Sequence, residues 1–164
     1  MVRRRAGTLQ PMEDTTRGSG VEIPVVVLSL SAELPRYARS GDAGADLVAS
    51  DGAFLPAGGG RALVPTGLAL AVPEGYAGLI VPRSGLAAKS GVTCLNTPGL
   101  IDSGYRGEIR VLLVNTDPQA AYEVRPGDRI AQLLVVPFVP AAFFAVAELD
   151  PTERGDGGFG HTGR

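Results

Sequence analysis

Apolar residues in this chain gather in short runs that glycine and proline interrupt. The clearest runs are Ala62–Val64, Gly67–Val72, Tyr76–Val81, Ile109–Val114 and Ile130–Val136. They are rich in β-branched residues and too short for typical helices, so they are typical of strands. The 23 glycines and 13 prolines supply the turns between them. The pattern therefore predicts an all-β jelly roll or β-sandwich.

The remaining segments add at most one short helix, expected around Gly85–Lys89. Residues 1–20 are polar and lack apolar periodicity, which predicts a disordered leader, with Met12 as a second candidate start. Residues 151–164 are rich in glycine and predict a flexible arm, either a plain disordered tail or a segment whose amides wrap an anion. The β domain is then expected to span residues 21–150.

Charge and composition narrow the possible partners. The net charge of −2 provides no overall basic field, so binding to nucleic acid or to an anionic membrane is not expected. The apolar stretch Leu133–Ala147 contains Pro137 and Pro140 and is too short for a membrane helix, so it predicts buried strands. Cys94 is the only cysteine and cannot form a disulfide within the chain, which fits a reducing, cytoplasmic setting.

Chemistry is suggested by segments where glycine stands beside polar or charged residues. They are Gly41–Leu47, Pro82–Ala87, Asn96–Ile109, Arg125–Gln132 and Arg154–Arg164. A site for a nucleoside triphosphate needs phosphate donors, a hard cation and a base near the attacked phosphorus. Arg83 and Ser84 supply donors where the short helix opens. Asp102 is predicted to project from a hairpin turn into a partly buried cleft, a placement that suits a general base.

In order, spacing and residue type these five segments resemble the motifs of the trimeric dUTP diphosphatase (dUTPase) family, from about Val21 to Gly163. The resemblance implies a β-clip jelly roll and a homotrimer with sites at subunit interfaces. It also implies Mg²⁺-dependent hydrolysis of dUTP to dUMP and pyrophosphate, which limits uracil in DNA and supplies dUMP for dTMP synthesis. In this family pattern Asp102 activates the attacking water, and Asp46 holds Mg²⁺ through its water shell.

The resemblance assigns substrate contacts as well. Arg83, Ser84 and Gly85 would bind phosphate, and Gln132 would bind phosphate or a metal-shell water. Asn96 and its hairpin would read uracil. The ring of Tyr105 would press on the deoxyribose and leave no room for a 2′-hydroxyl.

The arm carries the last part of the pattern. Arg154 would contact the γ-phosphate, Phe159 would stack on uracil, and Gly160 and Thr162 would add phosphate contacts. His161 departs from the pattern, because the family commonly has serine there. Arg129, outside the arm, is expected to support structure or a neighbouring subunit.

Two alternatives stay open. The dCTP deaminase branch shares the fold but places a catalytic glutamate where this chain has Leu112, and zinc deaminase motifs are absent. A jelly-roll module without catalytic activity is the other alternative. The joint presence of Asp46, Asp102, Tyr105 and the arm motif disfavours it, and a pyrophosphate-release assay separates the three.

Overall fold

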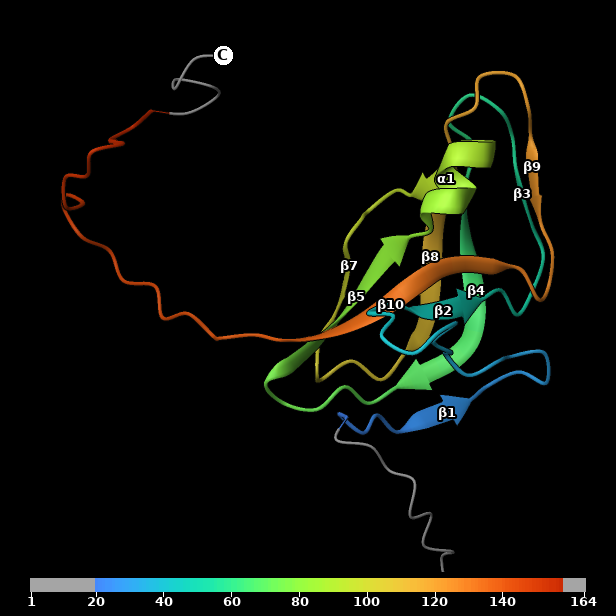
Figure 1. The fold of residues 1–164 in the computed structure, drawn as a ribbon, viewed down its shortest axis with the longest axis horizontal. Helices are drawn as coiled ribbons and strands as arrows, with labels where there is room; N and C mark the ends of the chain where they lie inside the picture. The colour runs from blue at the N-terminus through green and yellow to red at the C-terminus, as the bar shows by residue number, and fades with distance from the viewer. Residues whose placement is uncertain (1–19, 158–164) are drawn as a thin grey trace, which may run out of the picture.

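The computed structural model describes residues 20–157, which form two four-stranded antiparallel sheets and a separate pair of strands (Figure 1). The first sheet has the order β1 (Val25–Val27), β4 (Arg61–Leu70), β8 (Glu108–Asn115) and β6 (Val92–Cys94). The second has the order β2 (Ala45–Val48), β10 (Arg129–Pro137), β5 (Tyr76–Pro82) and β7 (Gly99–Ile101). The pair is β3 (Ala53–Leu55) with β9 (Tyr122–Val124). The all-β prediction is confirmed.

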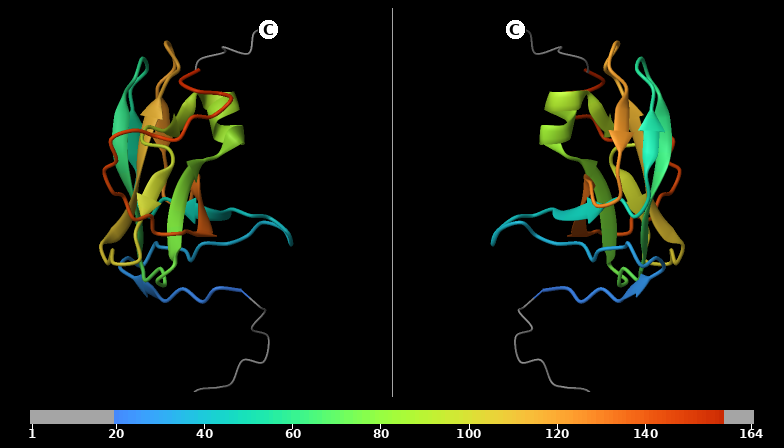
Figure 2. Two further views of the ribbon diagram at one scale, coloured as in Figure 1. Left: turned by 90° about the vertical axis from the view of Figure 1, so that its left-hand side faces the viewer. Right: turned by 90° about the vertical axis from the view of Figure 1, so that its right-hand side faces the viewer.

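The single helix of the described residues is α1 (Ser84–Ser90), close to the predicted segment. It ends at Gly91, whose positive φ of 62° places it in the left-handed conformation that glycine adopts most easily. Figures 1 and 2 show α1 at the same end of the molecule as the β3–β9 pair. No helix in this part of the chain is long and apolar enough to cross a membrane.

The core joins inward-facing side chains of both large sheets. On β8, Ile109, Val111 and Leu113 are buried at alternate positions, as a strand with one face on the core requires. The thiol of Cys94 is also buried in this core, and burial raises its pKa to about 11. Cys94 therefore packs as an apolar side chain.

Two predicted runs proved to be parts of one strand. Ala62–Val64 and Gly67–Val72 fall largely within β4, whose pairing with β8 shifts register between Pro65 and Ala69. Inside this bulge the hydroxyl of Thr66 donates a 2.6 Å hydrogen bond to the carbonyl of Ile109. The bulge therefore fastens β4 to the beginning of β8.

The prediction of buried strands through Ala147 is wrong beyond Pro137, where β10 ends. From Pro137 to Asp156 every residue is exposed, and Figure 1 shows the segment leading away from the two sheets. Its large apolar side chains include Phe143, which is 95% exposed, and Phe144. Apolar character and β-branched residues alone therefore did not locate the end of β10.

The hairpin predicted around Asp102 is also corrected. β7 pairs with β5 in the second sheet, whereas β8 pairs with β4 and β6 in the first. The residues between β7 and β8 therefore pass from one sheet to the other. Glycine and polar residues correctly indicated a turn, but they did not reveal which sheet each flanking strand joins.

Candidate active site

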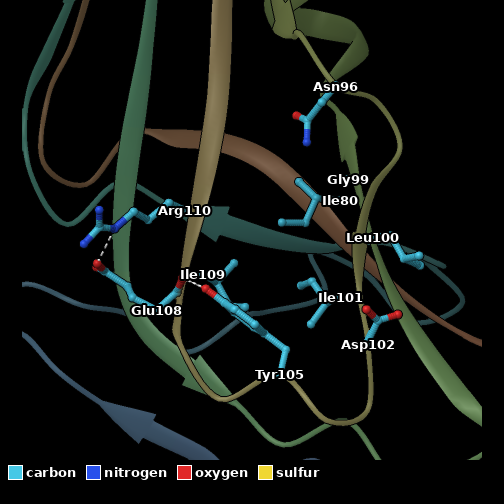
Figure 3. A pocket seen from close by; sticks show the side chains of 10 residues that line it. All are labelled: Ile80, Asn96, Gly99, Leu100, Ile101, Asp102, Tyr105, Glu108, Ile109 and Arg110. Carbon is cyan, nitrogen blue, oxygen red and sulfur yellow. Dashed lines mark hydrogen bonds and ion pairs between the residues drawn. The ribbon is translucent and has the colours of Figure 1, made fainter.

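A cavity of about 170 Å³ opens where the chain passes from β7 to β8. We call it the Asp102 cavity; its lining residues are Ile80, Asn96, Gly99, Leu100, Ile101, Asp102, Tyr105, Glu108, Ile109 and Arg110. Figure 3 shows Asp102 on the β7 side and Arg110 on the β8 side. The structure thus brings together Asn96, Asp102 and Tyr105, which the sequence placed in one motif.

Asp102 follows directly after β7, and its carbonyl accepts a 3.0 Å hydrogen bond from the N–H of Tyr105, which closes a four-residue turn. Its side chain is more exposed than predicted, and its carboxylate has no hydrogen-bond partner among the described residues. A carboxylate with free lone pairs at the edge of a cavity can accept a proton from water.

Tyr105 lies across the cavity from Asn96 (Figure 3), and the residue is 45% exposed. Its hydroxyl donates a 3.0 Å hydrogen bond to the carbonyl of Glu108, the first residue of β8. The hydroxyl therefore fixes the position of the ring, which lines the Asp102 cavity.

Glu108 and Arg110 line the cavity although the sequence reasoning did not select them. The Nε of Arg110 lies 2.7 Å from a carboxylate oxygen of Glu108, and the other oxygen accepts the N–H of Gly67 at 3.0 Å. Their i, i+2 spacing could have indicated them, because alternate residues of a strand point to the same face and Ile109 between them points to the other.

A second group of predicted residues gathers on the second sheet, around β2, β10 and the end of β5. We call Asp46, Arg83, Arg129 and Gln132 the Asp46 cluster. Asp46 on β2 pairs in register with Gln132 on β10, and Arg83 follows directly after β5, which also pairs with β10. Three neighbouring strands thus bring these side chains together.

The carboxylate of Asp46 is the centre of this cluster, with its side chain 9% exposed. One oxygen accepts a 2.9 Å hydrogen bond from Arg129, and the other lies 3.3 Å from the amide nitrogen of Gln132 and 3.6 Å from the Nε of Arg83. The expectation that Arg129 supports structure agrees with this contact. Two arginines against one carboxylate leave an excess positive charge, which suits a phosphate-binding surface.

The two groups do not share a cavity. Asp46 and Arg129 line a separate cavity of about 270 Å³, and no residue lines both it and the Asp102 cavity. The predicted site is therefore divided within one chain into two parts.

The other predicted residues lie outside both groups. Ser84 and Gly85 are exposed in the first turn of α1, beside Arg83. Arg154 is exposed on the C-terminal segment, where its Nε donates to the carbonyl of Gly157. Phe159, Gly160, His161 and Thr162 lie outside the described residues.

The donor set around Asp46 restricts the kind of metal ion that fits. Within residues 20–157 no group of three His, Cys, Asp or Glu side chains is placed to enclose an ion. Mg²⁺ usually keeps several waters and needs only one or two carboxylates together with substrate phosphates. Because the oxygens of the single carboxylate of Asp46 already contact Arg129, Arg83 and Gln132, this carboxylate would meet such an ion only through its waters and together with substrate phosphates.

The two four-stranded sheets form an all-β fold of the jelly-roll, β-clip type. The family model described as dUTPase matches residues 31–163. The deoxyuridine 5′-triphosphate nucleotidohydrolase of Cutibacterium acnes is 54% identical over 142 residues, covering 87% of this chain and 93% of that protein. That of Leifsonia xyli subsp. xyli is 51% identical over 143 residues, covering 87% and 91%. The chain therefore belongs to the dUTPase family.

Solved structures agree with this assignment. The dUTPase of Staphylococcus bacteriophage 80alpha with dUPNHPP has a TM-score of 0.79 and 28% identity, covering 87% of this chain and 99% of that one. A mutant dUTPase of phage phi11 of S. aureus, described with a structural Mg(II) ion, has a TM-score of 0.70 and 26% identity, covering 78% and 98%.

Proposed function

We propose that this protein hydrolyses dUTP to dUMP and pyrophosphate with Mg²⁺, as a homotrimer whose sites lie between subunits. Membership of the dUTPase family supports the reaction. The observation that carries the site assignment is the Asp102 cavity, which combines a free carboxylate with an aromatic ring and an amide side chain.

Asp102 is the proposed general base. Its unpartnered carboxylate accepts a proton from the water that attacks the α-phosphorus, and pyrophosphate leaves. The donor and acceptor of the Asn96 side chain suit the edge of a pyrimidine, and the ring of Tyr105 packs on the deoxyribose. Glu108 and Arg110 close the opposite side of the cavity.

The Asp46 cluster is the proposed phosphate side of a site. Arg83 binds phosphate oxygens, with Ser84 and Gly85 beside it at the beginning of α1. Asp46 and Gln132 would face the waters of Mg²⁺, which when bound neutralises charge on the phosphate chain. Arg129 holds the carboxylate of Asp46 in position.

Two observations support the trimer. The site of a single chain is divided between two cavities, so halves from different subunits are needed if each site is to be complete. The exposed apolar side chains after Pro137, among them Phe143, Phe144 and Leu149, also need a partner to cover them.

The arm completes the proposed site. Arg154 would contact the γ-phosphate, Phe159 would stack on uracil, and Gly160 and Thr162 would add phosphate contacts. A chain truncated after Glu153 should lose most activity while its melting temperature stays unchanged, because no strand or core residue is removed. A clear fall in melting temperature would instead indicate that the arm contributes to the stability of the fold.

The proposed setting is the cytoplasm, where the reaction would limit uracil in DNA and supply dUMP for dTMP synthesis. Product analysis with dUTP, dCTP, dTTP and UTP, each with and without Mg²⁺, tests the function. We expect dUMP and pyrophosphate from dUTP with Mg²⁺ only. Release of ammonia from dCTP, or no turnover of any nucleotide, would contradict the proposal.

A further inference from the structure

We infer that Gly107 is a positioning residue for sugar selection, because the ring of Tyr105 occupies the space that a side chain on residue 107 would need. This inference rests on the proposed function, in which that ring excludes the 2′-hydroxyl of a ribonucleotide. Gly107 lies directly before β8, two residues after Tyr105.

The contact between these residues leaves no room for a side chain on Gly107. A Cβ added there would lie 2.7 Å from Cζ of Tyr105 and 3.1 Å from its Cε2, and closer still to the hydroxyl oxygen. Carbon atoms in van der Waals contact lie about 3.5–4.0 Å apart. The ring can therefore keep its present place only while residue 107 is glycine.

The strand on the other side of this contact is firmly held. The hydroxyl of Tyr105 donates to the carbonyl of Glu108, whose carboxylate accepts the N–H of Gly67. The next carbonyl, that of Ile109, accepts the buried hydroxyl of Thr66. β8 is thus tied to the β4 bulge at two consecutive residues, whereas Tyr105 is 45% exposed. A Cβ at position 107 should move the ring and leave the strand in place.

The backbone allows the substitution. Gly107 is absent from the glycines with positive φ in the described chain, so alanine does not meet the strain of a left-handed conformation there. Gly107→Ala therefore tests the contact with the ring.

We expect Gly107→Ala to break the hydrogen bond between Tyr105 and Glu108 and release the ring from its fixed position. The ratio of kcat/KM for UTP to that for dUTP should rise about two- to tenfold, the range that one lost hydrogen bond allows. The melting temperature should change little, because only the exposed end of a side chain moves.

Gly104→Ala is the matched control. Gly104 lies in the same connection, has no positive φ, and an added Cβ would meet nothing within 4 Å. Gly104→Ala should leave the UTP to dUTP ratio at the wild-type value. Gly107→Ala should also have no further effect on the ratio in a Tyr105→Ala background, where there is no ring to displace.

The decisive experiment measures kcat/KM for both nucleotides, the affinities for dUMP and UMP by calorimetry, and melting temperature in all of these variants. A ratio unchanged by Gly107→Ala, changed equally by Gly104→Ala, or changed again in the Tyr105→Ala background would overturn the inference. A wild-type protein without dUTP turnover would refute the proposed function instead. The affinities for dUMP and UMP would then still test whether Gly107 positions the ring of Tyr105.

Discussion

The Asp46 cluster and the Asp102 cavity each contain one central aspartate, but the two carboxylates are in opposite situations. That of Asp46 is nearly buried and contacts Arg129, Arg83 and Gln132. That of Asp102 is exposed and has no side-chain partner among residues 20–157. The Asp46 oxygens are already occupied by protein donors, whereas the free Asp102 oxygens can accept a hydrogen bond from a water molecule at the edge of the cavity.

Residue type alone therefore does not assign a role to either aspartate. Asp46 gathers positive groups and fixes their positions, so its loss should affect both the fold and phosphate binding. The side chain of Asp102 is exposed and has no partner among residues 20–157, so its loss should affect the chemical step and leave the stability of the fold nearly unchanged.

The largest expected effect belongs to Asp102→Asn, which keeps the size of the side chain and removes the base. We expect kcat to fall by about 10²- to 10⁴-fold. The free energy of unfolding should change by less than about 0.5 kcal/mol, because the side chain is exposed and unpaired. Steady-state kinetics and urea unfolding check both parts. Near-normal turnover would remove Asp102 from the mechanism.

Mixing two inactive variants tests whether the two groups of one site come from different chains. Asp102→Asn keeps an intact Asp46 cluster, and Arg83→Ala keeps an intact Asp102 cavity. In an equal mixture that reassembles at random, about a quarter of the sites should contain both intact groups. The mixture should therefore show about a quarter of the wild-type activity. Co-refolding, native mass and pyrophosphate release provide the measurement. Activity no higher than that of the two parents would mean that one chain supplies both groups.

Tyr105→Ala tests whether the ring that lines the Asp102 cavity selects the sugar. Removing the ring opens space beside the sugar, so the ratio of kcat/KM for UTP to that for dUTP should rise about tenfold even if both rates fall. Competition assays with the two nucleotides measure this ratio directly. A constant ratio would show that another group excludes the 2′-hydroxyl.

Asp46→Asn should show the smallest effect, about 1–1.5 kcal/mol in the free energy of unfolding, because Arg129 and Arg83 lose their counter-charge. The value is modest because the Arg129 side chain is 53% exposed and water screens the pair. Glu123→Gln is the control, since it breaks the exposed pair with Arg125 and should cost less than about 0.5 kcal/mol. Equal losses for both variants in urea unfolding would contradict the structural role of Asp46.

The longer strands were predictable because each combines β-branched residues with turn residues at its ends, as in Tyr76–Val81 and Ile130–Val136. Strands of three residues, such as β6 and β7, are too short to show a period. The pairing of β7 and β8 in different sheets was not predictable, because it depends on contacts distant in sequence. The exposure after Pro137 was missed because apolar character does not specify which surface will cover a segment.

The candidate site was predictable to the level of its motifs. Asn96, Asp102 and Tyr105 do meet in one cavity, and Asp46, Arg83 and Gln132 do cluster. The pairing of Asp46 with two arginines was not foreseen, because it depends on the register of β2, β10 and β5. The fit of Tyr105 over Gly107 requires atomic positions that no motif contains.

The buried thiol of Cys94 has a practical consequence for chemical labelling. Burial raises the pKa of this thiol to about 11, so the thiol stays protonated at neutral pH, and the core shields it from reagents. Cys94 is also the only cysteine in the chain. A cysteine introduced at exposed Ser84 would therefore react alone with a maleimide dye or spin label. The natural sequence thus serves as an unreactive background for labelling the protein at one chosen site.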